Sequence, residues 1–248
     1  MERYLGLSRW DGVRAEDLPR DIDGVILGDL FCERAMFPGG AMESLFFAQS
    51  CADLGEKVIY QTGYYLPDSD LQEEILTMDA YYKDAGTRTF LVQDVGLVII
   101  ARKRYPDAKL VWSHMGRNRG QQVTKEFVTF LKELGIGGME TDRIERMRAF
   151  REAGMPVYAV DGNLVYQTMG RLCYTRYETD DHSIPCSRAC MGEKRFLVNR
   201  QNGIQMEVDG YLLGAKLCEP GDREAFDEAA EQYAGALMQY RRDLEAIR

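Results

Sequence analysis

One sequence pattern recurs along the chain and constrains the fold more than any other feature. An amphipathic stretch ends in a glycine, and a short apolar run follows; the four glycines are Gly55, Gly86, Gly135 and Gly154. A glycine directly after a helix can adopt the left-handed conformation that ends it. The apolar runs are short enough to be strands buried on both faces. Repeated units of this kind predict a parallel sheet covered by helices, the α/β class.

The number of apolar runs indicates which α/β architecture to expect. Seven strands are expected, near residues 3–7, 24–28, 57–60, 89–92, 109–112, 136–139 and 156–160, and an eighth is a candidate at residues 205–208. This number favours a TIM-like (β/α) barrel over an open sheet. We therefore expect one barrel domain over residues 1–248, incomplete or irregular if the eighth strand does not join it.

Two segments do not follow this alternation of helix and strand. Residues 168–192 have little apolar periodicity and read as a long functional loop over the carboxyl-terminal rim of the barrel. In residues 222–248, apolar side chains alternate steps of four and three: Phe226, Ala230, Tyr233, Leu237, Tyr240, Leu244 and Ile247. This spacing predicts a long C-terminal helix with a narrow apolar seam. The seam docks on its own barrel, which we favour, or on a partner.

Polar residues follow the apolar runs. They are Asp29, Gln61, Gln93, Asp94, Ser113, His114, Glu140 and Asp161. Because the carboxyl ends of parallel barrel strands meet on one rim, these residues together predict a polar pocket there, although polar residues also end strands for ordinary reasons. Our catalytic candidates are His114, Asp94 and Glu140, and Asp161 is a candidate for binding substrate. His114 is equally compatible with a structural, hydrogen-bonded role.

The charge balance limits the choice of partners. The chain carries 31 Lys and Arg against 40 Asp and Glu, a net charge of −9, which would repel a nucleic-acid backbone over most of the surface. A local basic group includes Arg171 and Arg176, which we expect to hold a small anionic or aromatic substrate or to pair with neighbouring acidic residues. No apolar run approaches the roughly 20 residues of a membrane span, and the N-terminus lacks a signal-peptide core. We expect a cytoplasmic protein.

Six cysteines are too few for a disulfide scaffold in a chain of this length. Cys173, Cys186 and Cys190 lie in the long loop, and three thiolates in a reducing compartment suggest a metal or iron–sulfur site. Cys32, just after the second strand, is the best fourth ligand. The spacing has no tight Cys-x-x-Cys pair, which favours a cluster over zinc, and unrelated cysteines remain an alternative.

The remaining two cysteines have a simpler explanation. Cys51 falls within a helix expected over residues 41–53, and Cys218 lies near the start of the C-terminal segment. A free cysteine behaves as a small buried hydrophobic residue, so we expect both to pack in the core.

Four motifs, taken in order, resemble a known family. They are Leu27-Gly28-Asp29-x-x-Cys32, the stretch from Gly170 to Arg176, Cys186-x-x-x-Cys190, and Asn202-Gly203-Ile204-Gln205. The sequence resembles the collagenase-like peptidase U32 family over essentially its whole length. Within that family it is most similar to the UbiV-like branch of the UbiU/UbiV oxygen-independent hydroxylation proteins.

The resemblance implies a TIM-like barrel that carries one [4Fe–4S] cluster on Cys32, Cys173, Cys186 and Cys190. It implies a role in oxygen-independent hydroxylation, as in ubiquinone biosynthesis, in a heterodimer with a homologous cluster-bearing subunit. Other branches act on tRNA or ribosomal RNA, so an RNA-modifying protein is one alternative and a non-catalytic cluster-bearing subunit is another. A protease is the weakest reading, because the chain has no Gly-x-Ser-x-Gly and no His-Glu-x-x-His motif.

Overall fold

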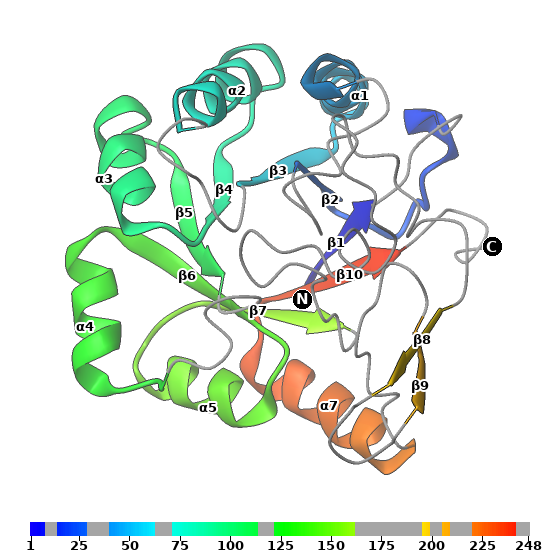
Figure 1. Cartoon of the computed structure of the whole chain (residues 1–248), viewed down its shortest axis with the longest axis vertical. Helices are drawn as coiled ribbons and strands as arrows, with labels where there is room; N and C mark the ends of the chain where they lie inside the picture. Colours follow the sequence, from blue (N-terminus) through cyan, green and yellow to red (C-terminus); the bar gives the residue numbers. More distant parts are fainter. Residues whose placement is uncertain are drawn as a thin grey trace.

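Eight parallel strands close into a barrel (Figure 1). The structure, a computed structural model, describes residues 1–7, 14–28, 40–62, 71–113, 122–161, 195–198, 205–208 and 220–241. The barrel strands are β1 (Glu2–Leu7), β2 (Gly24–Gly28), β3 (Lys57–Gln61), β4 (Thr89–Val92), β5 (Lys109–Ser113), β6 (Ile136–Thr141), β7 (Val157–Asp161) and β10 (Ala236–Arg241). Each strand pairs with its neighbours in chain order, and β10 joins β7 to β1. The predicted TIM-like barrel is confirmed.

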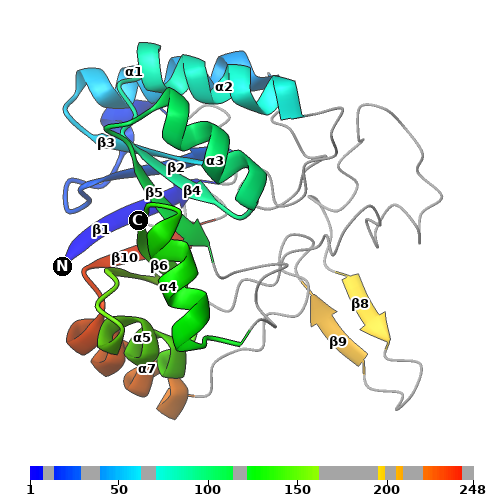
Figure 2. The same ribbon diagram turned by 90° about the vertical axis from the view of Figure 1, so that its left-hand side faces the viewer.

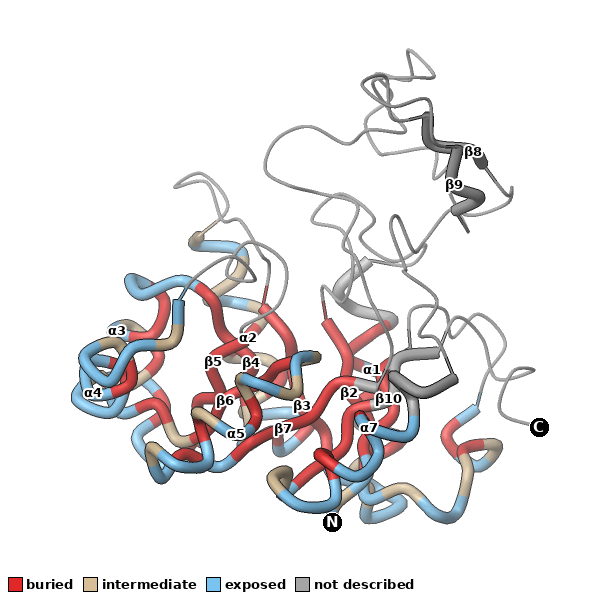
Figure 3. The backbone as a smooth tube through the Cα atoms, turned by 90° about the horizontal axis from the view of Figure 1, so that it is seen from below, coloured by how far each residue is buried: buried red, intermediate tan, exposed pale blue. Residues whose placement is uncertain are grey.

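Helices surround the barrel and bury one face against it (Figures 1 and 3). They are α1 (Gly40–Asp53), α2 (Leu71–Asp84), α3 (Val95–Arg104), α4 (Lys125–Glu133), α5 (Ile144–Glu152), α7 (Pro220–Tyr233) and the short 3-10 helix η1 (Ala15–Asp17). The glycines after α1, α2, α4 and α5 have φ angles between 64° and 86°, the left-handed conformation that the sequence predicts. In the described part of the chain, no helix has both the length and the apolar character needed to cross a membrane.

The eighth barrel strand is not the predicted one. Residues 205–208 do form a strand, β9 (Gln205–Val208), but it pairs antiparallel with β8 (Arg195–Val198) in a separate two-stranded sheet. That sheet lies beyond the carboxyl ends of the barrel strands (Figure 2). β8 and β9 are too close in sequence for the crossover that a parallel barrel strand requires, so they form a hairpin-like pair instead.

The prediction of one long helix over residues 222–248 was also wrong. Helix α7 ends at Tyr233, and β10 follows it to close the barrel. In β10, Met238 belongs to the core inside the barrel and Leu237 to the core between strands and helices, an alternation that a helical seam cannot produce. Phe226 and Ala230 pack in the core of this chain. The prediction that the apolar seam packs on its own barrel is therefore confirmed for this part of it.

The barrel interior is arranged in layers. Strand tilt shifts the facing position by one residue from each strand to the next, so alternate strands supply the four side chains of one layer. Tyr4, Ile59, Val111 and Tyr158 form an apolar layer, and the layer above it, toward the carboxyl end, holds Ile26, Leu91, Glu140 and Met238. The next layer holds Gly6, Gln61, Ser113 and Val160. Polar side chains therefore enter the interior at Glu140 and increase toward the carboxyl end.

The amino end of the barrel is closed by paired charges. Lys57 Nζ lies 2.5 Å from Glu2 Oε1, and the Tyr4 hydroxyl donates to Glu2 Oε2 at 2.8 Å. Lys109 Nζ lies 4.9 Å from the centre of the Tyr158 ring, a cation–π contact. Every one of these groups has a partner inside the protein, which is typical of the stabilising end of a TIM barrel.

Candidate functional site

Four polar side chains line one side of the barrel interior near its carboxyl end. Gln61, Gln93, Ser113 and Glu140, here called the polar wall, come from four successive strands, β3 to β6, or from the residue just after the strand. Each lies two positions beyond a residue that faces the interior, so strand alternation directs it inward. Gln61, Ser113 and Glu140 are fully buried, and Gln93 is 9% exposed.

The opposite side of the same layers is apolar. Ile26, Met238 and Val160 are fully buried there, and Gly6 contributes no side chain. The interior near the carboxyl end thus has a hydrogen-bonding side on β3 to β6 and an apolar side on β7, β10, β1 and β2.

Three members of the polar wall are direct neighbours. Ser113 pairs in register with Glu140, and Trp112 with Val92, so continuing that register by one residue places Gln93 beside Ser113. Adjacent strands lie about 5 Å apart, which brings the amide, the hydroxyl and the carboxyl within reach of one small molecule. A carboxyl group can take or give a proton, and the amide and hydroxyl can orient the group that exchanges it.

Asp94, predicted to be catalytic, has a defined structural contact. Its Oδ1 accepts a hydrogen bond from the Leu97 backbone N–H at 2.9 Å, which makes Asp94 the N-cap of α3. The Asp94 side chain is exposed. The cap fixes the backbone immediately after Gln93, so the structure assigns Asp94 a part in holding the β4–α3 turn.

Glu140, also predicted to be catalytic, lies deeper than a rim residue. It is fully buried on β6, beside Tyr158 in the strand register. Two residues further on, both carboxylate oxygens of Asp142 are buried as well. The described side chains that face the interior at the Glu140 layer or nearer the carboxyl end include no Lys, Arg or His.

The other predicted site residues fall outside the described ranges. They are Cys32, Cys173, Cys186, Cys190, His114, Arg171 and Arg176. Asp161 ends β7, but its side chain is outside the description, as is Cys218. Within the described ranges, no three His, Cys, Asp or Glu side chains are grouped to hold a metal ion. Cys51 is fully buried as predicted, and burial raises the pKa of its thiol to about 12.

The chain order relates several of these residues to described strands. Cys32 comes four residues after Gly28, the last residue of β2. His114 directly follows Ser113 of the polar wall. The segment that carries the other three cysteines starts at the carboxyl end of β7. In chain order, all of the predicted ligands therefore follow β2 or β7, strands whose carboxyl ends lie at the same end of the barrel as the polar wall.

A solved structure shares this architecture along nearly the whole chain. The barrel fold is shared with a solved U32 peptidase. The structure of the U32 peptidase Mk0906 matches with a TM-score of 0.57 and 15% sequence identity, over 98% of this chain and 94% of that chain. Orotidine 5'-phosphate decarboxylase from Pyrococcus horikoshii OT3 matches with a TM-score of 0.50 and 12% identity, over 96% and 89% of the two chains.

These identities show a common fold and nothing finer. No family model matches the sequence, and no curated protein matches it. The resemblance to the U32 family seen in the cysteine motifs is therefore supported at the level of the fold.

Three members of the polar wall were not singled out from the sequence as site residues. Gln61, Gln93 and Ser113 stood among the polar residues at strand ends, and only Glu140 was chosen from the four. These residues can be recognised by their position in the alternation of inward-facing and outward-facing side chains along each strand. Each lies two residues beyond an apolar or glycine residue that faces the barrel interior. The sequence alone does not give this alternation, because the strand register determines which residues of each apolar run face the barrel interior.

Proposed function

We propose that this chain is an iron–sulfur protein of the U32 peptidase family that works in oxygen-independent hydroxylation, as a UbiV-type component beside a homologous cluster-bearing partner. One observation carries the proposal: in the sequence, the four candidate cysteines lie in the segments that follow β2 and β7, whose carboxyl ends are at the end of the barrel where the polar wall lies. The shared fold with a U32 peptidase supports it.

The chemistry of the donor set fits a cluster. Cys32, Cys173, Cys186 and Cys190 would hold a [4Fe–4S] centre through four thiolates, which would supply electron transfer or order the loop that carries them. A centre with four protein ligands has no open iron position for substrate. In this proposal the substrate is therefore bound by the side chains of the barrel interior.

The chain's own residues then have distinct tasks. Glu140 exchanges a proton with the substrate, while Ser113 and Gln61 orient the reacting group. The apolar side, with Met238 and Val160, packs against the rest of the substrate and excludes water. His114 is a second candidate for proton transfer.

The reaction class explains why both parts are needed. With water as the oxygen donor, replacing a C–H bond by a C–OH bond releases two electrons and two protons from the reactants. A [4Fe–4S] centre would take one electron at a time, so the centre on this chain and the one on the cluster-bearing partner would together take both. A buried carboxyl such as Glu140 would take one proton, and the other would pass to solvent. Arg171, Arg176 and Asp161 are further candidates for holding the substrate.

Anaerobic purification of the full chain tests the cluster. We expect a brown protein with broad absorption near 400 nm, from iron–thiolate charge transfer, and about four iron atoms per chain. Cys186→Ala should lose most of this absorption and iron. Cys51→Ala is the matched control: it removes a thiol that is buried in α1 and should keep the colour. A colourless protein with one zinc would contradict the redox function.

The partner is tested separately. If the chain works with a homologous subunit, the two should co-purify, and anaerobic formation of the hydroxylated product should require both. Product formation by the isolated chain would contradict the proposed division of labour. Normal complex formation with no dependence of the product on Glu140 would assign the chain a supporting, non-catalytic role.

A further inference from the structure

Gln93 differs from the other buried polar groups of the site. Its side-chain Nε2 and Oε1 are both buried, and neither has a hydrogen-bond partner. Removing an amide from water without replacing its hydrogen bonds is unfavourable, and buried amides in folded proteins are almost always paired. A buried amide with both ends unpaired therefore indicates a binding partner that comes from outside the chain.

The position of Gln93 is fixed by its neighbours. It follows Leu91, which faces the interior, by two residues. Immediately after it, Asp94 caps α3 through Leu97 N–H at 2.9 Å, and the Asp94 carbonyl accepts from Val98 N–H at 3.0 Å. These bonds hold the backbone immediately after Gln93. The β4–β5 register, continued by one residue, places Gln93 beside Ser113.

The surroundings define the kind of group that fits. An amide offers a carbonyl acceptor and an N–H donor side by side, so its best partner offers a donor and an acceptor in the same arrangement. An anion would face the Gln93 carbonyl oxygen and lie close to the Glu140 carboxyl group. The described interior residues at this end include no cation to offset that repulsion.

We infer that Gln93 is the specificity-determining residue of the barrel site and selects a neutral ring with an amide-type edge, in which an N–H or O–H donor stands beside a carbonyl acceptor. Ser113 and Glu140 contact the same edge, and the apolar side with Met238 and Val160 contacts the ring. The inference shares with the proposed function only the location of the substrate in the barrel. It requires neither the cluster nor turnover.

A binding measurement on the full chain tests this inference with two small probes. 2-Pyrrolidinone has the donor and the acceptor in one ring, and N-methyl-2-pyrrolidinone lacks the donor. Ligand-observed NMR titration should show that the wild-type protein binds 2-pyrrolidinone about tenfold more tightly, because the methylated ring leaves a buried acceptor unpaired. Gln93→Leu should remove this preference. Gln72→Leu, the same substitution at an exposed site on α2, should retain it.

Thermal unfolding gives an independent readout. Since the Gln93 amide makes no bond in the free protein, Gln93→Leu should unfold at the same temperature as the wild type or about 2–4 °C higher. A melting temperature several degrees lower would overturn the inference, because it would show that the amide has a partner within the protein. Failure of the wild type to bind 2-pyrrolidinone, or equal preference in Gln93→Leu, would also overturn it. Because no iron is measured, these failures are distinguishable from failure of the proposed cluster.

Discussion

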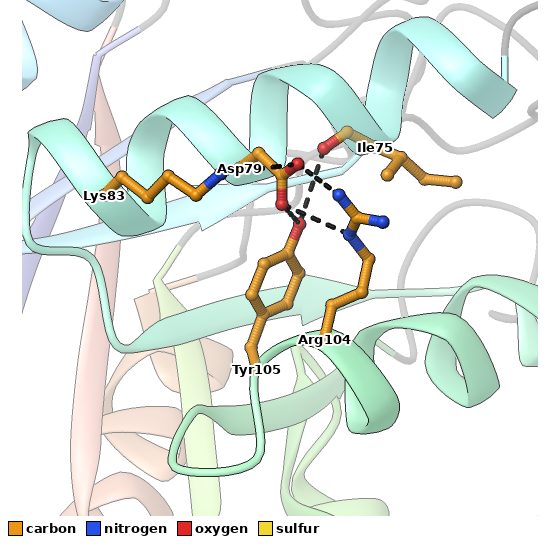
Figure 4. A network of polar contacts seen from close by, with 5 residues as sticks. All are labelled: Ile75, Asp79, Lys83, Arg104 and Tyr105. Carbon is orange, nitrogen blue, oxygen red and sulfur yellow. Dashed lines mark hydrogen bonds and ion pairs between the residues drawn. The ribbon is translucent and has the colours of Figure 1, made fainter.

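Asp79 and Gln93 show two opposite ways of placing a polar side chain in this barrel. Asp79 of α2 accepts from Arg104 Nε at 3.2 Å and from the Tyr105 hydroxyl at 2.8 Å, and Lys83 Nζ lies 3.9 Å away (Figure 4). Gln93 has no partner at either end. The polar contacts between α2 and the end of α3 therefore stabilise the outer layer, while the unpaired amide inside is available to a ligand.

The first prediction concerns Asp79. The hydrogen bonds from Arg104, together with that from Tyr105, lower the pKa of Asp79 below its ordinary value. A carboxyl with a lowered pKa in the folded state stabilises the protein above the unfolded-state pKa, and this contribution is lost as the pH falls through the folded-state value. Asp79→Asn should lower the melting temperature by about 3 °C at pH 7 and progressively less toward pH 3.

Thermal unfolding across this pH range checks the prediction. Asp84→Asn, which makes the same charge change at an exposed position on the same helix, is the control and should have little effect. A loss of stability in Asp79→Asn that is as large at pH 3 as at pH 7 would show that the ionised carboxylate is not the stabilising form.

Among the elements, α7 and β10 show how local pattern and barrel closure compete. Phe226, Ala230 and Tyr233, spaced by four and three residues, lie on one face of α7 and pack against the core. The same spacing also reaches Leu237, although Leu237 belongs to a strand. The order of α7, Gly235 and the apolar run of β10 is the same pattern of helix, glycine and apolar run that precedes other strands. Barrel closure determines the outcome, because β1 pairs with β10 along its whole length.

Met238→Ala distinguishes the strand from the seam helix. Met238 is fully buried inside the barrel, and Leu237 is buried on the other face of the same strand. Truncating Met238 should therefore lower the free energy of unfolding by about 3 kcal/mol, as at other core positions. A helical seam would place Met238 off the apolar face and predict a loss near zero. Urea unfolding of Met238→Ala and Leu237→Ala measures both; a large effect at Leu237 alone would contradict the strand.

Most helices and strands were predictable, because glycines mark the ends of the helices and short apolar runs mark the strands. The glycines after α1, α2, α4 and α5 have the expected left-handed conformation, and the strands β1 to β7 lie where apolar runs occur. The site was less predictable. The burial of Glu140 at the end of β6 agrees with a pocket-facing position, and its catalytic role stays a prediction. The role of Asp94 depends on whether its carboxylate accepts from the Leu97 N–H, which the sequence does not specify. The unpaired state of Gln93 likewise depends on packing by residues distant in the sequence.

At the scale of the whole molecule, the two ends of the barrel have different chemistry. At the amino end, Lys57 pairs with Glu2, and Lys109 lies against Tyr158. At the carboxyl end, the polar wall faces an apolar side, and the small sheet of β8 and β9 lies beyond it (Figure 2). This division places stability at one end of the barrel and the proposed chemistry at the other.

The central claim is that this barrel carries an iron–sulfur cluster at its carboxyl end. Native mass spectrometry of the anaerobically purified full chain tests it directly. We predict a species heavier than the polypeptide by roughly 350 Da, the mass of four iron and four sulfide ions, which is absent from the Cys186→Ala variant. A polypeptide that carries no added mass, or only the mass of one zinc ion, would contradict the claim.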